Sequence, residues 1–151
     1  MTRRVRIMAC GSFHGGDDAA ALEVLKLLPP KVGERASVEE VLQLSAEQLL
    51  GDGADTVRLV VDCVHGLAPG EVVELPLAEL PSLERSLGVA STHALGVGQA
   101  VALAVALGGV HPADRFLGIG GERYAQGAEL SPRVAAGLPQ LAGRIAELVA
   151  G

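Results

Sequence analysis

Residues 7–18 read IMACGSFHGGDD, an apolar run that leads into glycines and then into two adjacent aspartates. A short apolar run bounded by a glycine predicts a buried first β-strand over residues 5–10. Glycine-rich loops that follow a first strand often bind phosphate groups at a helix N-terminus. Here the loop ends in Asp17 and Asp18, whose negative charges would repel a phosphate. The loop therefore predicts a site for a positively charged group.

Strands and helices alternate outward from this loop. The segment 68–77 predicts a turn and an edge strand, because its apolar residues alternate and Pro76 is tolerated only at a sheet edge. The whole pattern predicts an α/β fold, a three-layer sandwich with a mainly parallel twisted sheet flanked by helices and one antiparallel edge strand. The other predicted strands are 36–42, 56–63 and 114–119, and the predicted helices include 17–28, 45–50 and 132–149. A further Ala-rich helix is predicted within the uncharged stretch that ends at residue 113, with Ser91 or Thr92 as its N-cap.

Length and composition limit the classes of protein. The 151 residues predict a single domain over 1–151, and the 49% hydrophobic and 20% charged residues are typical of a globular chain. A net charge of −6 and only 2% aromatic residues argue against binding nucleic acid. Cys10 and Cys63 form no disulfide framework, and no stretch has the pattern of a signal peptide or a membrane span. We expect a cytoplasmic protein without membrane insertion.

Three polar residues fall where strands of such a sheet end. The aspartate pair Asp17 and Asp18 supplies one of them after the first strand, Asp62 closes the apolar run TVRLVVD, and His93 lies at the start of the Ala-rich helix. Ligands of open α/β sheets bind at the carboxyl ends of the strands. Carboxylates and an imidazole suit a divalent cation, although the spacing matches no compact metal-binding motif. The three residues together predict a candidate metal site with positions open for a substrate.

Each of these residues also has a purely structural interpretation. Asp17 or Asp18 can cap the first helix, although two adjacent charges weaken this explanation for both together. His93 is equally compatible with a hydrogen bond to a loop carbonyl. Asp62 is hardest to explain in this way, because a buried carboxylate without a partner is expensive.

The other histidines and the cysteines give weaker signals. His14, His65 and His111 are interpreted as loop histidines, the first two close to the candidate site. The two cysteines are interpreted as small apolar residues at strand ends. A nucleophilic role would need a lowered thiol pKa.

Four motifs in order along the chain resemble the nickel-iron hydrogenase maturation proteases. IMACGSFHGGDD (7–18) resembles their first strand and GxGNxLxxDD-like loop, and VVDCVHGLAPGEVVEL (60–75) resembles their central strand, aspartate and "pG" turn. STHALGVGQAVALAVALGG (91–109) is similar to their SxH helix start, and FLGIGGERYAQGAELSPRVAAGLPQLAGRIAELV (116–149) to their last strand, LSP turn and final helix. VLQLSAEQLL (41–50) resembles the QLxPEL segment of the branch that serves soluble, cytoplasmic hydrogenases.

This resemblance implies an endopeptidase that removes a C-terminal extension from the precursor of a hydrogenase large subunit after nickel insertion. Asp18, Asp62 and His93 would be the catalytic and metal-contacting residues by position. The nickel would belong to the substrate protein, and no permanent organic cofactor is expected. An acidic loop is then explained, since its ligand is a cation inside another protein. The supporting loop would comprise Gly11, Ser12, Gly16 and Asp17.

The chain departs from the family pattern in the same loop. Ala9 replaces the first glycine of GxGN, and Ser12 replaces its asparagine. A relative without peptidase activity, acting as a metal-site recognition or chaperone module, is therefore the alternative. Other classes fit less well. A nucleotide-binding protein lacks the GxxxxGK[ST] and GxGxxG motifs, a serine hydrolase lacks GxSxG, and a zinc hydrolase would carry stoichiometric zinc.

Overall fold

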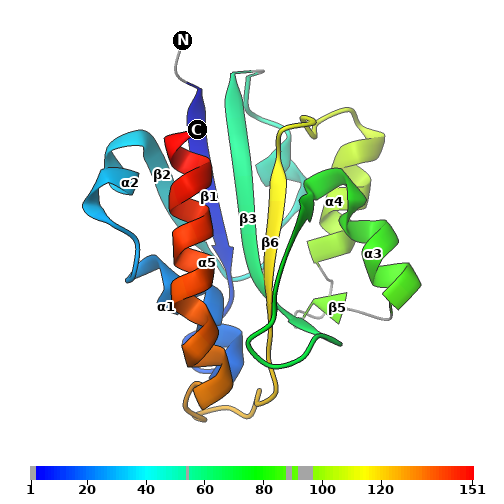
Figure 1. Cartoon of the computed structure of the whole chain (residues 1–151). Helices are drawn as coiled ribbons and strands as arrows, with labels where there is room; N and C mark the ends of the chain where they lie inside the picture. Colours follow the sequence, from blue (N-terminus) through cyan, green and yellow to red (C-terminus); the bar gives the residue numbers. More distant parts are fainter. Residues whose placement is uncertain (1–2, 54, 88–89, 92–96) are drawn as a thin grey trace.

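The computed structural model describes residues 3–53, 55–87, 90–91 and 97–151. Its middle layer is a twisted sheet with the strand order β2-β1-β3-β6-β4 (Figure 1). The pairs β1–β2, β1–β3 and β3–β6 are parallel, whereas β4 pairs antiparallel with β6 at the edge. The predicted fold class and its antiparallel edge strand are confirmed. The strands are β1 Arg4–Cys10, β2 Ala36–Val41, β3 Thr56–His65, β4 Val72–Pro76, the two-residue β5 Ala90–Ser91 beside β3, and β6 Arg115–Gly120.

Alternation along the central strands divides the buried residues between the two faces of the sheet. On β3, Leu59 and Val61 belong to one core cluster, whereas Val60 and Val64 belong to the other. Both faces of this strand are therefore covered, which explains why residues 56–63 read as a nearly continuous apolar run.

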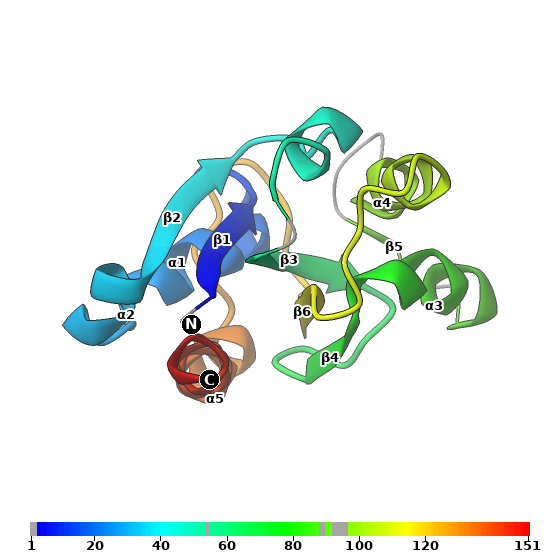
Figure 2. The same ribbon diagram turned by 90° about the horizontal axis from the view of Figure 1, so that it is seen from above.

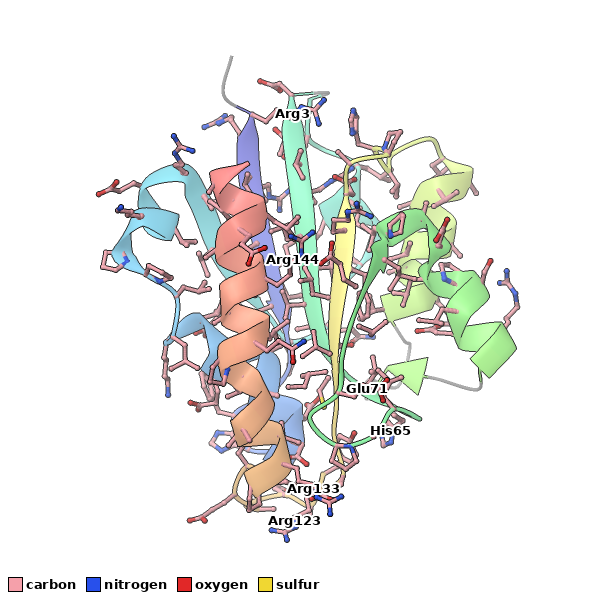
Figure 3. All side chains as sticks on the ribbon, viewed as in Figure 1. Arg3, His65, Glu71, Arg123, Arg133 and Arg144 are labelled. Carbon is pink, nitrogen blue, oxygen red and sulfur yellow. The ribbon has the colours of Figure 1, made fainter. Side chains whose placement is uncertain are left out.

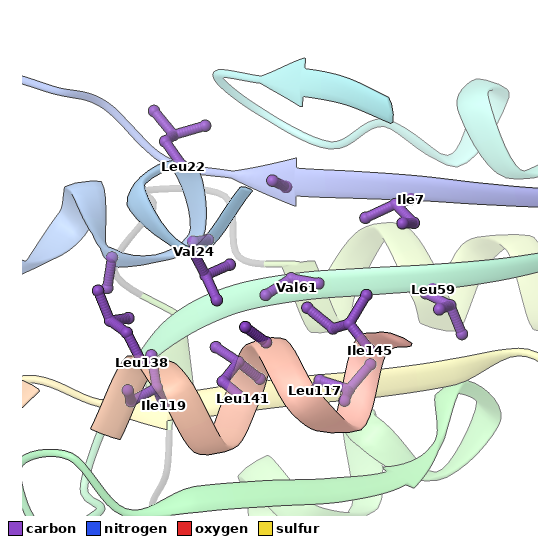
Figure 4. Packing of buried hydrophobic residues seen from close by; sticks show 14 of the residues in the cluster. Ile7, Leu22, Val24, Leu59, Val61, Leu117, Ile119, Leu138, Leu141 and Ile145 are labelled. Atoms are coloured by element: carbon purple, nitrogen blue, oxygen red, sulfur yellow. The ribbon is translucent and has the colours of Figure 1, made fainter. Parts of the chain in front are cut away.

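One face is covered by α1 (Ala20–Leu25), α2 (Pro30–Arg35) and α5 (Pro132–Ala150), as Figure 2 shows from above. The long helix α5 presents Leu138, Leu141 and Ile145 to the sheet at helical spacing (Figure 4). These side chains pack with Val61 and Leu117 of the central strands. Burial of aliphatic side chains in this cluster holds the C-terminal helix on the sheet.

The opposite face is covered by shorter elements, namely the 3₁₀ turns η2 (Ala46–Leu49) and η3 (Leu77–Glu79) and the helices α3 (Leu80–Leu87) and α4 (Val97–Ala106). Val97 and Val101 of α4 lie in one cluster with Met8, Val60 and Phe116. Helix α4 therefore belongs to the core on this face of the sheet.

Several predicted helix bounds are wrong. The helix predicted over 17–28 is split into the 3₁₀ turn η1 (Gly16–Ala19) and α1, which ends at Leu25. Pro30 does not only end a helix but starts α2, because proline is well tolerated in the first turn. Helix α3 was not predicted, and α4 ends at Ala106 rather than near 113. The predicted cap Thr92 lies outside the described residues.

At the amino end of the sheet a buried ion pair joins β3 to the loop before β6. Arg58 is 3% exposed and Asp114 is 1% exposed. Arg58 Nη2 donates to Asp114 Oδ2 at 2.8 Å, and the Arg58 backbone N–H donates to Asp114 Oδ1 at 2.8 Å. The guanidinium also donates to the carbonyls of Leu49 and Gly109. Both charges are thus compensated inside the protein, as a buried pair requires.

No helix in the described part of the chain is long and apolar enough to cross a membrane.

Candidate active site

The loops after β1, β3 and β6 meet at the carboxyl edge of the sheet. Figure 3 shows His65, Arg123 and Arg133 at this end of the molecule and Arg3 at the opposite end. Asp18 lies in the loop after β1, and Asp62 lies near the end of β3. The topology therefore brings the two predicted carboxylates to one edge, the usual ligand-binding edge of such sheets.

Asp17 ties the acidic loop to the segment before α5. Its side chain is fully buried and accepts hydrogen bonds from the backbone N–H groups of Glu122 (2.8 Å), Arg123 (2.8 Å) and Ser131 (2.7 Å) and from Ser131 Oγ (2.6 Å). Burial raises the pKa of Asp17, but these hydrogen bonds outweigh it and hold the pKa below its ordinary value. Of the adjacent aspartates, Asp17 therefore has an internal structural role. Asp17 does not cap its own helical turn. Ser131 stands at the N-cap position of α5, but its hydroxyl donates to Asp17 and does not cap that helix.

Asp18 is partly exposed, in contrast to its neighbour. The Ser12 N–H donates to the Asp18 carbonyl at 3.3 Å, and the Asp18 N–H donates to the Gly15 carbonyl at 3.1 Å. A Cβ on Gly11 would lie 2.1 Å from the Asp18 carbonyl oxygen, so only glycine allows this close approach. The glycines of the loop thus fold the backbone tightly around Asp18. Its carboxylate is left at a position that solvent reaches.

Asp62 is 0% exposed, although it lies in a strand of apolar residues. Alternation along β3 puts it on the face of Val60 and Val64, which is covered by α3 and α4. The negative charges of Asp62 and Asp18 both contribute to a raised pKa at Cys10 and at Cys63. The two carboxylates therefore act on the same small region between β1 and β3.

The two cysteines lie in this region but are poor nucleophiles. Burial, followed by the charges of Asp62 and Asp18, raises the pKa of Cys10 well above its ordinary value. Burial is also the main reason that the pKa of Cys63 is raised to about 12. Both thiols are consequently protonated at neutral pH, and a thiolate mechanism is not supported.

Glu84 was missed by the sequence reasoning. It lies on α3, partly buried, and its Oε1 atom is buried without a hydrogen-bond partner among the described residues. Burial and the charge of Asp62 raise the pKa of Glu84, so the two carboxylates lie within electrostatic reach of each other. A sequence signal did exist, since Glu84 follows the buried Leu80 by four residues and therefore shares its inward face.

His93 lies outside the described residues, so the structure gives no position for the third predicted ligand. Among the residues that are described, no group of three or more His, Cys, Asp and Glu side chains is arranged to hold a metal ion. His65 stacks on Tyr124 with ring centroids 4.1 Å apart. His111 accepts from the Ala113 N–H at 3.1 Å before β6, at the amino end of that strand.

Two cavities of about 690 and 540 Å³ lie at the other end of the sheet, near the amino ends of β1 and β3. Both are lined by Arg3, Val5 and Arg35. They contain neither Asp18 nor Asp62, so cavity size alone would direct attention away from the acidic edge.

No family model matches the sequence, and the search of curated proteins found no match. Solved structures do match, over almost the whole chain. The [NiFe] hydrogenase maturation protease HybD from Thermococcus kodakarensis is 28% identical with a TM-score of 0.75, covering 98% of this chain and 99% of its own. The hydrogenase maturating endopeptidase HybD from E. coli is 20% identical with a TM-score of 0.71, covering 94% and 89%. HycI from Thermococcus kodakarensis, another [NiFe] hydrogenase maturation protease, is 21% identical with a TM-score of 0.66, covering 99% and 94%.

The fold is thus that of the [NiFe] hydrogenase maturation proteases over almost the whole chain. The resemblance found in the sequence motifs is confirmed by this structural similarity.

Proposed function

We propose that this protein is an endopeptidase that recognises the nickel-loaded large-subunit precursor of a [NiFe] hydrogenase and removes its C-terminal extension. Its metal is the nickel of the substrate protein, and it needs no permanent organic cofactor. The observation that carries the proposal is the pair Asp18 and Asp62, brought from two strand ends to one edge of this fold. We place the protein in the cytoplasm, where its precursor would be made.

The proposed chemistry starts from charge. Asp18 and Asp62, together with His93, would complete the coordination of a nickel ion exposed on the precursor and so bring the scissile peptide to the carboxyl edge. Oxygen and nitrogen ligands of this kind suit a borderline divalent cation. A divalent metal can polarise a carbonyl or activate a water, which makes peptide hydrolysis feasible at neutral pH.

The two halves of the acidic turn would have different tasks. The Asp17 carboxylate accepts hydrogen bonds from the backbone N–H groups of Glu122, Arg123 and Ser131. These bonds fix the turn to the C-terminal part of the chain. Asp18, the next residue, is then held at the surface, where a partner protein can reach it. Because the hydrogen bonds of Asp17 hold the turn in place, Asp18 would be pre-organised as a ligand for the cation.

A cleavage assay tests the proposal. The protein is mixed with a hydrogenase large-subunit precursor, with and without inserted nickel, and the C-terminus of the product is read by mass spectrometry. We expect nickel-dependent loss of a C-terminal peptide. Asp18→Asn, Asp62→Asn and His93→Ala should each lower the rate by at least about 100-fold.

Glu34→Gln serves as the control, because Glu34 is an exposed carboxylate on α2 beside the cavity at the amino end of the sheet. Its activity should equal that of the unaltered protein. Binding of the loaded precursor without any cleavage would contradict the proposed activity and define a recognition module. Ser12→Asn would then be the first substitution to make, because it restores the asparagine of the family pattern.

A further inference from the structure

The carboxylate of Glu84 makes a close contact with the first turn of α4. It accepts a hydrogen bond from the backbone N–H of Gly98, the second residue of that helix. A Cβ on Gly98 would lie 1.9 Å from Glu84 Oε2 and 2.8 Å from Oε1. Position 98 must therefore be glycine for this contact to exist, and the two residues fit one another across two helices.

This contact gives the first turn of α4 an acceptor from another helix. The first N–H groups of a helix have no partner within the helix and are usually satisfied by a polar side chain just before it. The first turn of α4, as far as the structure describes it, contains no acidic residue of its own. Glu84 provides both the acceptor and the negative charge that favour the N-terminus of a helix.

The cost of this arrangement points to a function. Leu80 is 1% exposed, and Glu84, four residues later, occupies a position where a second apolar residue would pack without penalty. Instead, a partly buried carboxylate lies there within electrostatic reach of Asp62, and both burial and Asp62 raise its pKa. Buried carboxylates that face one another destabilise a fold, and such conflicts concentrate at functional sites.

We propose that Glu84 is a positioning residue of the site: anchored on the Gly98 N–H, it holds the first turn of α4 over the end of β3 where Asp62 lies. Val97 packs in one cluster with Cys10 and Val64, so this turn borders the same region on which Asp18 and Asp62 act. Gly98 follows His93 by five residues in the sequence. The inference rests on the proposed function for its effect on cleavage, but not for its effect on α4.

Three substitutions separate the effect of the hydrogen bond between Glu84 and Gly98 from the effect of the negative charge of Glu84. Glu84→Ala removes the acceptor, Gly98→Ala pushes the carboxylate away, and Glu84→Gln keeps an acceptor of the same length. Two matched controls are Glu79→Ala, an exposed glutamate of η3, and Gly143→Ala, a helix glycine whose added Cβ would meet nothing within 4 Å.

Amide hydrogen exchange reads the anchoring directly, without a substrate. The Gly98 amide proton of the unaltered protein should exchange about 10-fold more slowly than in Glu84→Ala, and Glu84→Gln should restore most of the protection. Gly98 protection unchanged in Glu84→Ala would overturn the inference. If the unaltered protein cleaves no precursor, the proposed function fails, and this measurement still decides whether Glu84 anchors α4.

Cleavage kinetics read the consequence for the site. A misplaced ligand-bearing segment lowers turnover more than precursor binding, so we expect kcat to fall about 10-fold in Glu84→Ala and Gly98→Ala with KM nearly unchanged. Glu84→Gln should recover most of kcat, and both controls should match the unaltered protein. Full activity of Glu84→Ala, or a Glu84→Gln variant as impaired as Glu84→Ala, would overturn the positioning role.

Discussion

The two ends of the sheet treat buried carboxylates in opposite ways. At the amino end, Asp114 faces the buried guanidinium of Arg58 and accepts several hydrogen bonds. At the carboxyl end, Asp62 has another carboxylate, Glu84, within electrostatic reach, and among the described residues Glu84 forms no salt bridge. The first arrangement stabilises the fold by itself. The second carries a repulsion that a cation would relieve, as the proposed recognition of nickel in a partner protein requires.

The amino-end pair should give the largest effect on stability. Arg58→Met leaves Asp114 charged and buried without its cation, and we expect a loss of about 3–5 kcal/mol in the free energy of unfolding. Urea denaturation measures it. A loss below about 1 kcal/mol would mean that this end does not depend on charge compensation, and the contrast between the ends would disappear.

Asp17 should give the next largest effect. Asp17→Asn weakens charge-assisted hydrogen bonds to Ser131, Glu122 and Arg123, and we expect a loss of about 2–3 kcal/mol at neutral pH. Because the pKa of Asp17 is lowered in the folded protein, its contribution is present above its ordinary pKa and is lost as the pH falls through the folded value.

Denaturation curves of both proteins at pH 7 and at pH 3 measure this dependence. The difference between Asp17→Asn and the unaltered protein should shrink at the lower pH. An equal difference at both pH values would show that the carboxylate charge does not hold the acidic turn.

The partly exposed pair of Glu74 and Arg144, between β4 and α5, should give the smallest effect. Glu74 accepts from Arg144 Nη2 at 3.0 Å, and this hydrogen bond is the main reason that the pKa of Glu74 is lowered. Solvent screens such a pair, so Glu74→Gln should change the melting temperature by less than about 3 °C near neutral pH. A larger change, seen by calorimetry, would place a second important ion pair outside the buried core.

Much of the fold was predictable because apolar runs and turn residues are local signals. The runs that form β1, β3 and β6 are buried on both faces, and the Ser131-Pro132 pair marks the start of α5. Helix α3 was missed because it is short and carries Pro81 at its second position, although proline is tolerated in a first helical turn.

The site was predictable only in part. Asp18 and Asp62 could be chosen because each follows or closes an apolar strand, and the topology puts them at one edge. That Asp17 is buried and hydrogen-bonded while Asp18 stays partly exposed could not be predicted, because the partners of Asp17 are more than a hundred positions away in the sequence. Glu84 could not be linked to Gly98 either, since only the packing of α3 against α4 brings them together.

One substitution made at both ends tests the central claim most directly. Asp114→Asn and Asp62→Asn each replace a fully buried carboxylate by its neutral isostere, and the free energy of unfolding is measured for both by urea denaturation. We expect Asp62→Asn to lose clearly less free energy of unfolding than Asp114→Asn, because removing the Asp62 charge relieves the repulsion with Glu84, whereas Asp114→Asn weakens the pairing with Arg58. A loss in Asp62→Asn as large as that in Asp114→Asn would contradict the account and make Asp62 part of the stabilising framework.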